Sequence, residues 1–173
     1  MIEKSFLRRG IEYILLLLLV IFVASCGERN KNSQVYSTPK EKEVTLLRKI
    51  TTIYIDKPQK ALQMLDSAEQ NKLIPIEDIQ NIRAVSYLYG LDNPNKALEC
   101  ANKGYSYAVE NEDTLAQLNS LKVLVSIYYV QSHYTEVIIK SNDAIELAKK
   151  CNDTESTAFF YMAVGSAKSE SII

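Results

Sequence analysis

Asp56-Lys57-Pro58-Gln59-Lys60-Ala61-Leu62 and Asp92-Asn93-Pro94-Asn95-Lys96-Ala97-Leu98 are two versions of one heptapeptide, 36 residues apart. A looser third version runs from Ser132 to Ile138. Recurrence with a period of about 20 to 50 residues is typical of proteins built from stacked copies of one supersecondary unit. Such stacks present extended binding surfaces, so the repeat predicts a binding module rather than an enzyme.

The composition is that of a folded, mainly helical protein. Hydrophobic residues make up 47% and charged residues 24% of the 173 positions, which is ordinary for a soluble domain. With 5 Gly and 4 Pro, the chain has few residues suited to the many tight turns of an all-β fold, and we expect an all-α protein. The formal net charge of −1 lacks the basic excess typical of nucleic-acid binding, so no nucleic-acid partner is expected.

The N-terminal segment predicts export and lipidation. Lys4, Arg8 and Arg9 precede an apolar run over 14–24, which suits a signal-peptide core and is shorter than the roughly 20 residues that span a bilayer. The run ends in Val23-Ala24-Ser25-Cys26, which resembles the lipobox of bacterial lipoproteins. The resemblance implies that 1–25 are removed as a signal peptide and that Cys26 carries a lipid anchor in a bacterial membrane.

The stretch after the cysteine predicts a flexible tether. Residues 26–42 are mostly polar and have no hydrophobic period. In Bacteroidota-type lipoproteins, an acidic cluster just after the cysteine is associated with export to the cell surface. Here Gly27 and Glu28 are followed by Arg29 and Lys31. We therefore expect an envelope protein on the periplasmic side of its membrane rather than on the cell surface.

Apolar residues spaced three or four apart predict a series of helices in the rest of the chain. The expected helices cover 44–55, 58–72, 76–89, 94–109 and 114–130, one that begins at 134, and 156–169. The clearest stripe lies on 114–130 and is formed by Leu115, Leu118, Leu121, Leu124, Val125 and Tyr128. The short breaks between helices predict antiparallel packing of neighbours. Pro58 and Pro94 suit a first helical turn, and Asp113 and Asp153 are suitable N-caps.

These helices resemble tetratricopeptide repeats. In that family the second helix of each pair carries small residues where it nests against the first. The matching positions here are Ala61, Leu65 and Ala68; Ala97, Ala101 and Gly104; and Val137, Ser141 and Ala144. Tyr161, Val164 and Gly165 resemble the family's first-helix pattern. The resemblance implies an α-α superhelix over 43–173, of about three helical hairpins plus one terminal helix, and the last repeat is incomplete.

The spacing of the copies exceeds that of the family. Copies 36 and about 40 residues apart are longer than the usual 34 or so. We expect the surplus in longer loops between hairpins, such as Leu73-Ile74-Pro75-Ile76.

The resemblance also implies a binding surface on the first helices of the pairs. Matching positions are Ser86, Tyr89, Asn119, Lys122, Ser126 and Tyr129, and Ser86/Tyr89 repeats as Ser126/Tyr129. Tyrosines and a lysine could grip an extended protein or peptide partner. The alternative is that these are ordinary solvated residues.

No motif in the sequence predicts catalysis, a metal site or a cofactor. His133, the only histidine, falls in a predicted turn, and we expect it to be exposed to solvent. A Cys100–Cys151 disulfide is conceivable in an oxidising periplasm. The two cysteines lie in different repeats, which favours a buried thiol at Cys100 and an exposed one at Cys151.

The last predicted helix has no following partner. It either serves as a solvating cap, or the chain is part of a longer protein, and its apolar character favours the second interpretation. The chain also resembles the sensory N-terminal part of Bacteroidota regulators with such repeats. The second functional hypothesis is therefore a truncated sensory portion of a transmembrane transcriptional regulator or sensor kinase. A nutrient-binding outer-membrane lipoprotein is a weaker third. Self-association through the uncovered helix is a further expectation.

Overall fold

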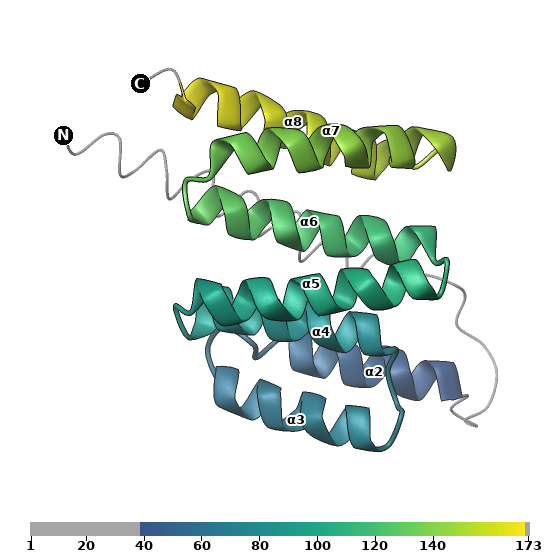
Figure 1. Ribbon diagram of the computed structural model, residues 1–173. Coiled ribbons are helices and arrows are strands. Elements are labelled where there is room, and N and C mark those ends of the chain that lie inside the picture. Colours follow the sequence, from purple (N-terminus) through teal and green to yellow (C-terminus); the bar gives the residue numbers. More distant parts are fainter. Residues whose placement is uncertain (1–38, 172–173) are drawn as a thin grey trace. The chain divides into compact units, whose positions relative to one another are not determined.

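A computed structural model describes residues 39–171 as helices joined by short turns, with no strand in that range, so the predicted all-α class is confirmed (Figure 1). The elements are α2 (Pro39–Thr51), α3 (Pro58–Gln70), α4 (Ile76–Val85), its π-helical continuation η2 (Ser86–Gly90), α5 (Pro94–Glu110), α6 (Thr114–Val130), α7 (Tyr134–Lys150) and α8 (Thr154–Ser171). The predicted signal peptide and Cys26 lie outside the described residues.

The chain divides into two compact units, 1–52 and 53–173. In the first unit, α2 carries Glu41 in its first turn and Arg48 and Lys49 in its last, the charge order that stabilises a helix dipole. The predicted tether ends too late, because residues 39–42 already belong to α2. The helix predicted over 44–55 also ends earlier, at Thr51.

The second unit is a stack of antiparallel helices from α3 to α8, each of which packs against the next (Figure 1). In addition, α4 packs on α6, and α6 packs on α8. These three helices, the first members of the predicted pairs, therefore form a continuous layer, which we call the A-layer. The A-layer brings together residues about 40 positions apart in sequence.

Helices α3 to α7 begin at the predicted residues, whereas α2 begins at 39 instead of 44 and α8 at 154 instead of 156. Pro58 and Pro94 occupy the first turns of α3 and α5, where the missing N–H of proline leaves no bond unmade. The Oδ1 atoms of Asp113 and Asp153 accept backbone N–H bonds from Ala116 and Ser156, both at 2.9 Å. These side chains fix where α6 and α8 begin.

The helix ends share one geometry. Non-glycine residues with positive φ occur at 72, 92, 112, 132 and 152, so 20 residues separate each from the next. After α5, the Glu112 N–H bonds to the Val109 carbonyl and the Asp113 N–H to the Ala108 carbonyl, each at 3.0 Å. This is the Schellman pattern, which satisfies the last carbonyls of a helix. Because Asp113 then caps α6, the turn needs only residues 111–113.

This regularity bears on the expectation that the residues beyond a 34-residue repeat lie in longer loops between hairpins. The helices α5, α6 and α7 each have 17 residues, whereas α3 has 13. The turns between them are short (111–113 and 131–133). The residues beyond a 34-residue repeat therefore lengthen α5, α6 and α7, while the loop 71–75, which was expected to be long, is two residues longer than these turns. The 36-residue spacing of the first two copies reflects the shorter α3.

The nine small or contact positions predicted on the second helices are all buried. They are Ala61, Leu65 and Ala68 on α3; Ala97, Ala101 and Gly104 on α5; and Val137, Ser141 and Ala144 on α7. At Gly104 there is no room for a side chain. A Cβ there would lie 2.8 Å from Asn81 Oδ1 and 3.2 Å from the Glu77 carbonyl oxygen. Helix α5 can therefore lie this close to α4 only with glycine at 104.

The predicted stripe on α6 is only partly right. Leu118, Leu121, Leu124 and Val125 are buried, but Leu115 is 53% exposed. Ser120, Val123 and Ile127, outside the stripe, are buried as well. Helix α6 contacts α4, α5, α7 and α8, so it is covered on most of its circumference, and a single stripe underestimates its burial.

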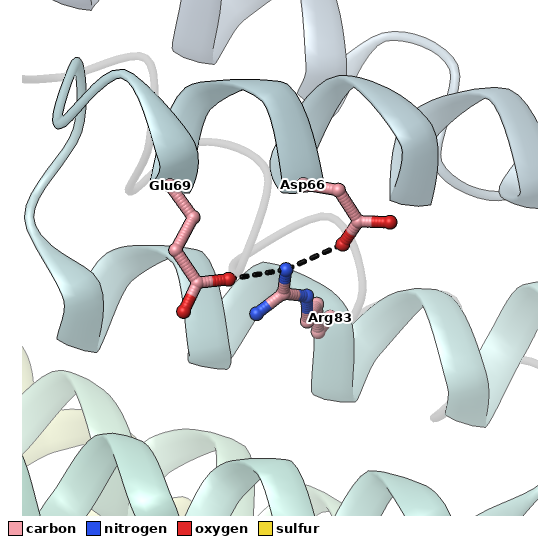
Figure 2. A network of polar contacts seen from close by, with 3 residues as sticks. All are labelled: Asp66, Glu69 and Arg83. Carbon is pink, nitrogen blue, oxygen red and sulfur yellow. Dashed lines mark hydrogen bonds and ion pairs between the residues drawn. The ribbon is translucent and has the colours of Figure 1, made fainter.

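An ion-pair cluster ties α3 to α4 (Figure 2). The Arg83 Nη2 lies 2.5 Å from Asp66 Oδ1 and 2.6 Å from Glu69 Oε2. Burial disfavours the charged guanidinium, but the two carboxylates outweigh this and raise the Arg83 pKa above its ordinary value. The cluster fixes the contact between one pair of helices and the next.

We predict opposite effects for one substitution at two glycines. Gly104→Ala should lower the free energy of unfolding by about 1 kcal/mol or more, because overpacking outweighs the helix-propensity gain. Gly165→Ala should raise it by about 0.5–1 kcal/mol, because nothing lies within 4 Å of a Cβ at that position. Urea denaturation at low protein concentration measures both. Equal effects at the two sites would show that α5 does not approach α4 as closely as described.

Candidate functional site

The six residues predicted to bind a partner all lie in the A-layer. Ser86 and Tyr89 are in η2, and the other four are on α6. Helix α4, which η2 continues, packs on α6, whereas η2 itself packs on α3 and α5. Asn81 Nδ2 of α4 also donates a hydrogen bond of 3.0 Å to Ser120 Oγ of α6. We call these six residues the A-layer site: Ser86, Tyr89, Asn119, Lys122, Ser126 and Tyr129.

The two serines do not present their protons to a ligand. Ser86 Oγ donates to the Ile82 carbonyl at 2.8 Å, and Ser126 Oγ donates to the Lys122 carbonyl at 2.9 Å. Both serines are buried. A hydroxyl bonded to the carbonyl four residues earlier satisfies itself within its own helix. Ser86 and Ser126 therefore recur because serine is small enough for a buried position and its hydroxyl finds a hydrogen-bond partner in its own helix.

The two tyrosines differ in exposure. Tyr129 is buried, and its ring meets that of Tyr134 edge to face, with 5.7 Å between centroids. Tyr89 is half-buried and lies in the π-helical turn. Such π-helical turns occur frequently at functional sites. Tyr89 is thus the tyrosine of the pair that a partner can reach in the described arrangement.

Lys122 is the buried charge of the site. Only 6% of the residue is exposed, and its Nζ lies 6.0 Å from the ring centroid of Phe159 on α8. Burial lowers the Lys122 pKa to about 8, although Asp153 and Glu155 oppose this. Phe159 was not among the predicted site residues. It follows Asn119 by 40 positions, so the repeat offset could have identified it.

Asn119 carries an unsatisfied acceptor. The residue is half-buried, and its Oδ1 has no hydrogen-bond partner among the described residues. A buried acceptor without a donor costs about 1–3 kcal/mol. A ligand that supplies an N–H to this atom would recover that cost.

The other residues considered for chemistry fall outside the site. His133 is exposed at the N-cap of α7. Both cysteines are free thiols: Cys151 is exposed, as predicted, and Cys100 is half-buried where a buried thiol was expected. Burial raises the Cys100 pKa, which makes this thiol less reactive. Within 39–171, no cluster of His, Cys, Asp or Glu could hold a metal ion. Over that same range, no helix combines the length and apolarity required to cross a bilayer.

The buried lysine predicts a pH-dependent stability difference. Its pKa is about 8 in the native state and 10.5 at its ordinary value, so between these pH values the unfolded state binds more protons. The free energy of unfolding of the wild type should then rise with pH over that interval. We expect Lys122→Met to be more stable than the wild type at pH 7 by on the order of 1–3 kcal/mol.

The measurement is urea denaturation of both proteins from pH 7 to 10.5, where the difference should shrink. Lys103→Met is the control, because Lys103 is exposed and forms an ion pair with Glu99 at 2.7 Å. A difference for Lys122→Met that stays constant with pH would contradict the lowered pKa.

Comparisons of this chain with protein-family models, curated proteins and solved structures gave no match.

Proposed function

We propose that this protein is a membrane-tethered, non-catalytic module of tetratricopeptide-like repeats that binds a protein or peptide through its A-layer site. The observation that carries the proposal is Asn119, a half-buried residue of α6 whose buried Oδ1 has no hydrogen-bond partner among the described residues. Backbone N–H groups of an extended segment are the donors most suited to it. Tyr89 would add aromatic contact from η2.

The repeat architecture supports this role. Stacked helical pairs build a continuous layer from residues far apart in sequence, and here α4, α6 and α8 form such a layer. The A-layer also contains buried polar groups from several helices, including Gln80, Asn81 and Ser120. Polar groups placed among apolar ones provide orientation in a binding site.

The proposed location is the periplasmic side of a bacterial membrane. It rests on the basic segment, the apolar run and Val23-Ala24-Ser25-Cys26 in the sequence. A diacylated cysteine anchors a protein stably because two or more chains are buried in lipid.

For the anchor, we predict that Cys26→Ser releases the protein from membranes. The substituted side chain lacks the sulfur that receives the lipid. The measurement is fractionation of cells that express the full chain, with Cys151→Ser as the matched control at an exposed thiol. If Cys26→Ser leaves membrane association unchanged, the anchor is not at this residue.

For the binding site, we predict that a photo-crosslinking amino acid in place of Asn119 yields a discrete adduct in cells. The same amino acid in place of Tyr107, an exposed tyrosine on α5, should not yield that adduct. Tyr89→Ala should lower the yield of the Asn119 adduct by about tenfold, as for an aromatic contact residue. Circular dichroism of the variants should show unchanged helicity.

The proposal fails if position 119 gives no adduct, or if positions 119 and 107 capture the same protein with equal yield.

A further inference from the structure

Helix α8 has an exposed face that carries both bulky and small residues. Tyr161 is 52% exposed and Met162 is 47% exposed. Ala158 and Gly165, three or four positions away, are exposed as well. A Cβ built on Gly165 would have no atom within 4 Å. We call Ala158, Tyr161, Met162 and Gly165 the α8 face.

Counting from the turns that precede α4 and α8 shows which side of α4 corresponds to the α8 face. The positive-φ turn before α4 is at 72, and the one before α8 is at 152, so Tyr161 occupies the position of Asn81. Asn81 lies at the contact between α4 and α5, opposite Gly104. The α8 face is therefore the side on which an equivalent helix receives another helix.

We propose that the α8 face binds the α8 face of a second copy of this chain, with the two helices antiparallel about a two-fold axis near residue 163. A two-fold interface requires a self-complementary surface. In this register Tyr161 of each copy lies opposite Gly165 of the other. The bulky ring thus fills the open space at the glycine, twice per dimer.

Charge is complementary in the same register. Glu155 is in the first turn of α8, and Lys168 is in the last together with Glu170, which at about 100° per residue points away from the α8 face. Antiparallel packing brings Lys168 of each copy to the end of the other helix that carries Glu155. A parallel pair would instead place like charges together at both ends, which is unfavourable.

Tyr161 is already held in position by its own chain. Lys149 Nζ of α7 donates a hydrogen bond of 2.8 Å to Tyr161 Oη and lies 5.3 Å from the ring centroid. A side chain ordered before association loses less freedom on binding.

Dimerisation through α8 goes beyond the proposed function, because it uses none of the six residues of the A-layer site.

The test is sedimentation equilibrium of the full chain in detergent micelles, compared with Gly165→Glu. We expect the wild type to dimerise at concentrations up to about 100 μM, and Gly165→Glu to weaken the dimer at least about tenfold. The glutamate blocks the position opposite Tyr161, while glutamate is a better helix former than glycine. Thermal denaturation should therefore show that the variant remains folded.

Cysteine cross-linking tests the register, in a chain whose Cys26, Cys100 and Cys151 are changed to Ser. An antiparallel pair centred at 163 separates the two copies of residue 162 by about 3 Å along the axis and those of 168 by about 15 Å. Met162→Cys should therefore form a disulfide-linked dimer, and Lys168→Cys should not. A monomeric wild type, a dimer unaffected by Gly165→Glu, or cross-linking at both positions would overturn the proposal.

Discussion

The close approach of α5 to α4 is the constraint on which the rest of the stack depends. At Gly104 there is no room for a Cβ, because Asn81 Oδ1 and the Glu77 carbonyl lie 2.8 and 3.2 Å from where it would stand. Small residues also occupy the matching positions Ala101 and Ser141, which are fully buried. Helices that approach this closely exclude water from the contact. They also bring α4 and α6 into one layer, from which Asn81 bonds to Ser120 at 3.0 Å.

The turns determine the spacing of that layer. Each described turn from Lys72 to Asn152 contains one residue of positive φ, and these residues recur every 20 positions. A left-handed residue that is not glycine costs roughly 1 kcal/mol. The Schellman bonds on both sides of it, as at Glu112 and Asp113, help to offset that cost. Because Asp113 also caps α6, one side chain terminates a connection and begins a helix.

Helix caps and the contact positions of the second helices were predictable from the sequence, whereas burial across the A-layer was predicted only in part. Asp113 and Asp153 were identifiable as caps because capping depends on the residue type and its immediate neighbours. The exposure of Leu115 and the burial of Lys122 depend on which helices lie across the layer, and periodicity along one helix does not contain that information. The surplus residues were assigned to loops for a similar reason. Sequence spacing alone cannot distinguish one more helical turn from a longer loop.

Lys122 is the residue of the A-layer whose burial packing alone explains least. An apolar side chain of similar length would fill the same place near Phe159 without a desolvation cost, whereas the lysine has its pKa lowered to about 8. Burying a charge in this way lowers stability. Asn119 adds a second cost through its unsatisfied Oδ1. Two destabilising groups one helical turn apart on α6 are unfavourable for folding alone. Perturbed groups are frequent at functional sites, and the lowered pKa of Lys122 one turn from Asn119 is the physical argument for proposing partner binding at the A-layer site.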